Sequence, residues 1–191
     1  MNVLRYGIQV GVCILTTGLI WAVAAQYDDP SKKNDKKTQA IDTAGIQFEI
    51  PDSWKSQPPT SQMRKAQIRI PAAEGDQEGA ELVLFVFPGG AGSVEANVER
   101  WRNQFTDESG DHPKVDTTKV KGQNVEVTRV EAAGTYKDPF AAGGPHANYR
   151  LYGAIVTTGD AGYFFKMVGP HKTMKQATGA FDQMLATIKK K

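Results

Sequence analysis

Cysteine is nearly absent from this chain, since Cys13 is the only one among 191 residues and lies in an apolar stretch near the N-terminus. The rest of the chain can therefore form neither an internal disulfide nor a thiolate metal site. An excess of charge of one sign is also lacking, because 23 basic residues stand against 21 acidic ones. Proteins that bind nucleic acid usually carry a concentrated basic surface, so we expect no nucleic-acid partner.

The familiar short motifs of metal and hydrolase sites are also lacking. His112, His146 and His171 stand far apart in the sequence, without an HxH or HExxH pattern. No serine stands in the GxSxG context of a hydrolase nucleophile. We therefore expect no metal and no cofactor, assign no catalytic residue, and favour a protein that is not an enzyme while leaving the question open.

One long apolar run is present, at residues 8–25, and it ends in the small residues of an export-signal cleavage site. Cleavage after Ala24 or Ala25 would release a periplasmic or extracellular protein. The run is also close to the about 20 residues of a membrane helix. If uncleaved, it would anchor the chain in the cytoplasmic membrane. Acylation of Cys13 is disfavoured, because Val12 precedes it where a small residue is expected.

The composition changes twice after this run. Residues 26–40 are charged, polar and almost free of apolar side chains, which predicts a disordered linker. Residues 41–191 have the length and composition of a single folded domain. We therefore predict three parts: a signal peptide or anchor at 1–25, a linker at 26–40, and one domain at 41–191.

The centre of that domain is a strand, a glycine turn and a helix. Residues 82–87 are six consecutive apolar residues, which favours a central strand covered on both faces. Gly89, Gly90 and Gly92 predict a tight turn with left-handed backbone. Ser93 is a good N-cap for a helix over 94–105, whose apolar face should cover the sheet.

The other segments alternate in the manner of strands or repeat in the manner of a helix. Strands are predicted at 46–50, 63–70, 115–121, 125–136, 149–155 and 163–168, with the third and fourth forming a hairpin. A final amphipathic helix should begin with Thr173 as its cap. The fold class is therefore α+β, with a mostly antiparallel sheet of about six to seven strands covered by two main helices.

This order of elements resembles a known superfamily. The landmarks are Pro51 and Trp54 after the first strand, the central strand and helix, and Gly169-Pro170 before a helix that contains Phe181. Over residues 45–188 this pattern resembles the Mog1/PsbP-like superfamily. The resemblance implies an α/β/α sandwich in proteins that generally act as binding or assembly modules, including extrinsic photosystem subunits and exported bacterial proteins. It implies no active-site residues.

Two segments are candidate binding sites. The first is the turn at Gly89, Gly90, Gly92 and Ser93, which leads from a strand into a helix as phosphate loops do. It lacks the lysine and the third glycine of such loops, so a plain structural turn is the favoured interpretation.

The second candidate is the loop that contains Phe140 and His146. Together with Tyr152 on the following strand, it could line a groove for a partner, although rim aromatics are often only structural.

From these observations we predict an exported bacterial domain that is not an enzyme and that binds or assembles with a protein partner in the cell envelope. The alternatives are an enzyme or a carrier of lipid or small ligands, with a site near the Gly89–Ser93 turn and the Phe140–His146 loop. A deep cleft that joins these two segments and contains ionisable groups with shifted pKa values would favour the enzyme.

Overall fold

The structure, a computed structural model, describes residues 37–138 and 144–191. The predicted signal or anchor, residues 26–36 of the predicted linker and Phe140 lie outside the described residues. Neither helix in the described ranges has the length and apolar character needed to cross a bilayer. Strand β1 begins at Thr38, so residues 38–40 belong to a strand and not, as we predicted, to the linker.

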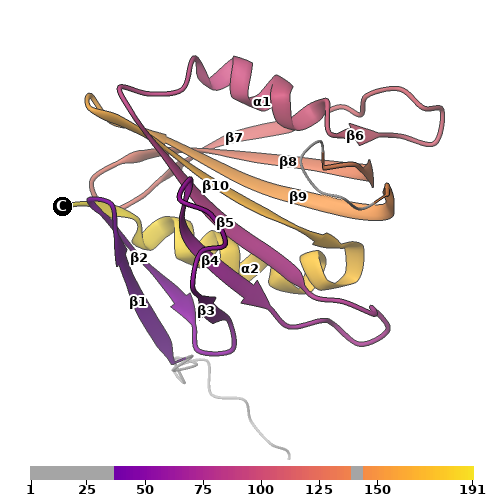
Figure 1. Cartoon of the computed structure of the whole chain (residues 1–191), viewed down its shortest axis with the longest axis horizontal. Helices are drawn as coiled ribbons and strands as arrows, with labels where there is room; N and C mark the ends of the chain where they lie inside the picture. The colour runs from indigo at the N-terminus through magenta and orange to yellow at the C-terminus, as the bar shows by residue number, and fades with distance from the viewer. Residues whose placement is uncertain (1–36, 139–143) are drawn as a thin grey trace, which may run out of the picture. The chain divides into compact units, whose positions relative to one another are not determined.

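The main sheet of the described chain is antiparallel and eight-stranded, in the order β3-β4-β5-β10-β9-β8-β6 with β7 paired to β8 (Figure 1). Its strands are β3 (Lys55–Gln57), β4 (Arg64–Ile70), β5 (Ala80–Pro88), β6 (Phe105–Thr106), β7 (Asp116–Lys121), β8 (Glu126–Tyr136), β9 (His146–Thr157) and β10 (Ala161–Pro170). A smaller sheet consists of β1 (Thr38–Thr43), β2 (Ile46–Pro51) and β11 (Lys189–Lys190). The helices are α1 (Val94–Arg102) and α2 (His171–Thr187). The predicted α+β class and antiparallel sheet are confirmed.

One face of the main sheet packs against α2 and the small sheet. Side chains at alternate positions of β5, β9 and β10 point to this side, as the two-residue period of a strand requires. They meet the apolar face of α2, which includes Phe181, and Phe48 of β2. Burial of these side chains supplies most of the hydrophobic stabilisation of the fold.

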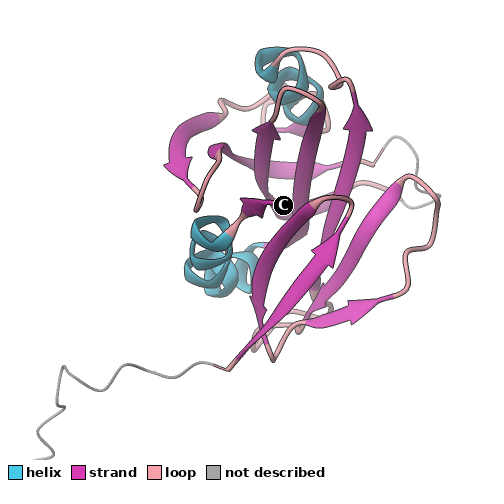
Figure 2. Cartoon of the chain, turned by 90° about the vertical axis from the view of Figure 1, so that its left-hand side faces the viewer, coloured by secondary structure: helices cyan, strands magenta, loops and turns pink. Residues whose placement is uncertain are grey.

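The opposite face is covered by α1 at one end only (Figures 1 and 2). Ser93 caps α1 as predicted, with its Oγ accepting a hydrogen bond from the Ala96 amide at 3.1 Å. Trp101 packs directly on Gly153 of β9, where a Cβ atom would lie 2.2 Å from the Trp101 ring. Beyond α1, the side of β5 that carries Glu81 and Val83 is not covered by a helix, so our expectation that this strand is covered on both faces was only half right.

The start of α2 differs from the prediction. The helix begins at His171 after Pro170, and Thr173 lies inside its first turn instead of capping it. The Thr173 amide and hydroxyl both donate to the Asp76 carboxylate, at 2.7 and 2.8 Å, so a residue from a distant loop does the work of the cap. After Thr187 the lysine tail pairs with β2 as strand β11.

Candidate functional site

The two segments that we expected to share one site lie at opposite ends of the strands. Pro88, next to the glycine turn, pairs with Ala161 at the start of β10, whereas Tyr149, next to the His146 segment, pairs with Pro170 at its end. Among residues 37–138 and 144–191, the structure therefore places the glycine turn and His146 apart.

The backbone groups of the glycine turn are hydrogen-bonded within the protein. Gly89, Gly90 and Gly92 have φ values of 73, 89 and 84°, the left-handed conformation that we predicted. The Gly89 amide donates to the Asp160 carbonyl at 2.8 Å, and the Gly90 amide donates to the Phe87 carbonyl at 3.0 Å. Ser93 is used as the helix cap, and the two amides already have acceptors, so the segment has the features of a structural turn.

Tyr152 is buried on the face of the sheet that packs against α2. Only 3% of the residue is exposed, and its hydroxyl accepts a hydrogen bond from the Thr178 hydroxyl at 2.8 Å. The Arg129 guanidinium lies 5.1 Å from the centre of its ring. Tyr152 therefore packs between β9 and α2 and does not stand at the rim of a groove.

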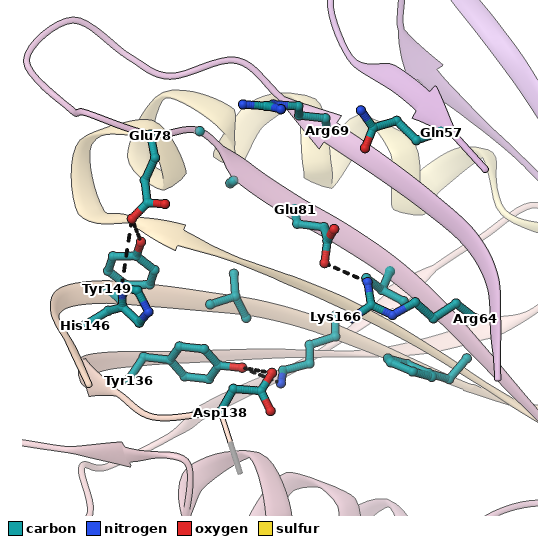
Figure 3. Close-up of a pocket in the computed structure, with 15 residues that line it drawn as sticks. Gln57, Arg64, Arg69, Glu78, Glu81, Tyr136, Asp138, His146, Tyr149 and Lys166 are labelled. Carbon is teal, nitrogen blue, oxygen red and sulfur yellow. Dashed lines mark hydrogen bonds and ion pairs between the residues drawn. The ribbon is translucent and has the colours of Figure 1, made fainter. Parts of the chain in front are cut away.

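His146 does line a cleft, on the half of the sheet that α1 leaves uncovered (Figure 3). We call it the Lys166 cleft, and its volume is about 370 Å³. Its apolar floor is formed by Val83, Phe85 and Val168, and its polar wall residues are Gln57, Arg64, Arg69, Glu78, Glu81, Tyr136, Asp138, His146, Tyr149 and Lys166. These residues come mainly from β4, β5, β8, β9 and β10, which the sheet order places side by side.

Lys166 is the central cation of the cleft. It is the one charged side chain in the otherwise apolar middle of β10, and alternation directs it away from α2 toward the cleft. Burial lowers the pKa of its amine to about 8 and outweighs the attraction of Asp138, while the nearby Arg64 charge lowers the pKa further and Glu81 opposes it.

A chain of hydrogen bonds runs from this amine to a carboxylate. Lys166 Nζ donates to the Tyr136 hydroxyl at 2.9 Å, and that hydroxyl donates to Asp138 Oδ2 at 3.0 Å. Burial and the Asp138 charge both raise the pKa of Tyr136, so its hydroxyl keeps its proton at neutral pH. Tyr136 thus links Lys166 to Asp138 and fixes the position of the amine.

The two glutamates of the cleft are engaged with other groups. Glu81 accepts from Arg64 Nη1 at 2.9 Å and from Gln67 Nε2 at 2.7 Å. At the other end, Glu78 accepts a short hydrogen bond from the Tyr149 hydroxyl and lies 3.9 Å from His146 Nδ1. The pKa of Tyr149 is raised, mainly by burial and next by the hydrogen bond to Glu78 and the charge of that carboxylate.

The chemistry of the cleft is thus that of a positioned amine among polar and aromatic groups. Within residues 37–138 and 144–191, no cluster of three potential metal ligands is present. The rings of Tyr136 and Tyr149 are parallel within 3°, with centres 6.2 Å apart, and face the cleft beside the apolar floor. Such a surface can hold a small organic group while the amine contacts its polar end.

Comparison with known proteins gives the fold. No protein-family pattern and no curated protein sequence matches the chain. Among solved structures, the solution structure of cyanobacterial PsbP (CyanoP) from Synechocystis sp. PCC 6803 matches with a TM-score of 0.54 at 10% identity, over 85% of this chain and 98% of that one. The chain has a PsbP-like fold. At this identity the match shows the fold alone.

Two further solved structures are similar to this PsbP-like chain at lower scores. One is from Bacteroides thetaiotaomicron, with a TM-score of 0.45 at 11% identity over 77% of this chain and 45% of that one. The other is a Pseudomonas aeruginosa protein of unknown function, with a TM-score of 0.45 at 12% identity over 78% of this chain and 94% of that one.

Sequence reasoning missed the main residues of the cleft in the PsbP-like chain. Lys166, Tyr136 and Glu81 come from three strands that are far apart in sequence and meet only in the sheet. One signal was available, because Lys166 interrupts the apolar segment Tyr163–Val168 at a position where a lysine must be buried or face a polar site.

Proposed function

We propose that the PsbP-like chain is an exported, non-enzymatic module that binds a protein partner in the cell envelope through the Lys166 cleft. The observation that carries the proposal is the uncovered half of the main sheet, where polar side chains surround an apolar floor (Figure 3). The α1 end of the same face is filled by apolar side chains, whereas here the face forms a hollow in which polar groups surround apolar ones, as in a binding site.

Export is supported by the apolar run at 8–25 and by the small residues that end it. The PsbP-like fold is compatible with a binding role, because a fold by itself does not fix a function. A lipid carrier is disfavoured, since the space between the main sheet and α2 is filled by packed core side chains such as Phe165, Met174 and Phe181.

The alternative of an enzyme has one specific observation in its favour. Lys166 has a lowered pKa of about 8 and is positioned by Tyr136, which are the properties of a lysine that attacks carbonyl carbons. Incubation with a small aldehyde followed by borohydride would leave a stable adduct on Lys166 ahead of the exposed Lys175 if the amine is reactive in this way. Equal labelling of the two lysines would count against an enzyme of this class.

Photocrosslinking in the native cells tests the binding proposal. The photoreactive residue benzoylphenylalanine is placed at Gln57, an exposed residue of the cleft wall, and at Gln183, an exposed residue on the outer side of α2, as a matched control. We expect a discrete crosslinked species from position 57 and none from position 183. No species from either, or the same species from both, would contradict binding through the cleft.

Fractionation tests export separately. We expect a processed chain that begins at Ala25 or Gln26 outside the cytoplasm, or a full-length chain in the membrane fraction. A full-length chain in the soluble cytoplasmic fraction would contradict the export part of the proposal.

A further inference from the structure

The ammonium of Lys166 is only partly hydrogen-bonded, whereas each carboxylate of the cleft already has a partner. Each of its carboxylates has a partner: Glu81 has Arg64 and Gln67, Glu78 has Tyr149, and Asp138 has Tyr136. A protonated lysine has three N–H donors, and only one of those of Lys166 is used within the described residues, in the bond to the Tyr136 hydroxyl. Two N–H donors of Lys166 therefore have no partner among the described residues.

The position of the ammonium makes these unpaired donors costly. Lys166 is partly buried, above the apolar floor of Val83, Phe85 and Val168. In the described chain no carboxylate lies within 4.0 Å of its nitrogen, although nine other ion pairs meet that limit. Charges that are withdrawn from water are normally paired, and a pair completed by a ligand would satisfy this one.

A second cation stands at the same cleft. The Arg69 guanidinium lines the wall, and no hydrogen bond or ion pair joins it to another described residue. Arg64 contributes a further positive charge, although Glu81 already occupies one side of it. An anion that enters the cleft would therefore meet both Lys166 and the more exposed Arg69.

We infer that the Lys166 cleft is a binding site for a carboxylate that is attached to a small apolar or aromatic group. The carboxylate oxygens would accept from the free N–H donors of Lys166, and the organic group would lie on Val83, Phe85 and Val168 beside the ring of Tyr149. This inference rests on the proposed function and deepens it, because an acidic side chain of a protein partner and a free organic acid present the same group.

Binding at this site is coupled to the proton of Lys166. The charged groups that face the amine are Asp138 after β8, Glu81 on β5 and Arg64 on β4, and the neutral group bonded to it is Tyr136. A bound carboxylate favours the protonated amine, so its affinity should fall as the pH rises past the pKa of about 8. The raised pKa values of Tyr136 and Tyr149 keep both hydroxyls neutral over that range.

The test is a titration of the full chain with benzoate, with benzamide as the uncharged isostere, followed by isothermal calorimetry or by NMR. We expect benzoate to bind at least about tenfold more tightly than benzamide, and to lose at least about tenfold in affinity between about pH 7 and pH 9.5. Lys166→Met should abolish both differences, whereas Lys175→Met, on the exposed side of α2, should change neither.

Other outcomes have definite meanings. Equal affinities for benzoate and benzamide, or benzoate binding that survives in Lys166→Met, would overturn the inference. Folding of the variant is checked by circular dichroism, and replacement of a partly buried charge by an apolar residue is often tolerated or stabilising. If photocrosslinking from position 57 succeeds while benzoate fails, the proposed function stands and the carboxylate inference falls. If benzoate binds and the crosslink fails, the carboxylate inference stands, binding of a protein partner through the cleft falls, and a free organic acid is the ligand.

Discussion

The partial burial of Lys166 predicts that its removal stabilises the protein at neutral pH. The folded-state pKa of about 8 lies below the ordinary lysine value of 10.5, and each pKa unit corresponds to about 1.4 kcal/mol, so keeping this amine protonated in the folded chain costs about 3 kcal/mol. Lys166→Met removes this cost and also the hydrogen bond to Tyr136, which contributes about 1 kcal/mol. The variant should therefore be about 2 kcal/mol more stable at pH 7.

The pH dependence identifies the cause. Below pH 8 the amine is protonated in both the folded and the unfolded chain, so the full cost of burial is present in the wild type. Between pH 8 and 10.5 the folded chain releases the proton first, so wild-type stability rises with pH relative to the variant. The advantage of Lys166→Met should shrink over that range.

Urea denaturation followed by circular dichroism at about pH 7, 8.5 and 10 measures this difference. Lys175→Met is the matched control and should differ little from the wild type at each pH, because Lys175 is exposed. A variant that is much less stable than the wild type at pH 7, or whose difference from it does not change with pH, would refute the assignment of Lys166 as a partly buried, unpaired ammonium.

Two further predictions concern the contact between Gly153 and Trp101 and the role of Asp76 at the start of α2. Gly153→Ala should lower the free energy of unfolding by about 1–3 kcal/mol, because its Cβ would lie 2.2 Å from the Trp101 ring. In a chain that already carries Trp101→Leu, the same substitution should have no such cost. Gly159→Ala, whose Cβ meets open space, is the control; additive effects at 153 and 101 would contradict the contact. Burial acts to raise the pKa of Asp76, but the hydrogen bonds from Thr173 lower it overall, so Asp76 contributes stability that is lost as the pH drops below about 4. Asp76→Asn should be less sensitive to acid than the wild type, while Glu95, Asp107, Glu126 and Asp160, whose pKa values are also lowered, keep their share. Equal acid sensitivity in Asp76→Asn and in the wild type, measured by urea denaturation, would contradict the role of Asp76 at the start of α2.

The sequence predicts the long elements well because their periodicity is strong. The run at 82–87 became the centre of β5, and Ser93 caps α1 as its position indicated. Very short strands such as β3 and β11 carry too few residues for alternation to be recognised. They exist because a neighbouring strand offers free backbone groups, which is a property of the assembled sheet.

The start of α2 shows how tertiary contacts override a local signal. Thr173 has the chemistry of an N-cap, yet Asp76 supplies an acceptor from a loop almost a hundred residues earlier, and the helix begins before it. No local pattern in the sequence reveals that partner.

The candidate site was the hardest part to predict from the sequence. His146 was named, but its neighbours Lys166, Tyr136 and Glu78 were not, because strand pairing alone brings them together. The glycine turn and the His146 segment, which were assigned to one site, lie beside opposite ends of β10. The order of elements along the chain does not reveal which end of a strand a loop will lie beside, because this depends on how the strands pair. Tyr152 is not part of the cleft because its side chain points to the side of the sheet that packs against α2.

The most direct test of the account is the crosslink from position 57, compared between the wild-type background and Lys166→Met in the native cells. If the cleft binds its partner through the ammonium of Lys166, the crosslinked species should be abundant in the wild-type background and strongly reduced in the variant, at equal levels of folded protein. An unchanged yield in Lys166→Met would contradict the claim that this amine recognises the partner.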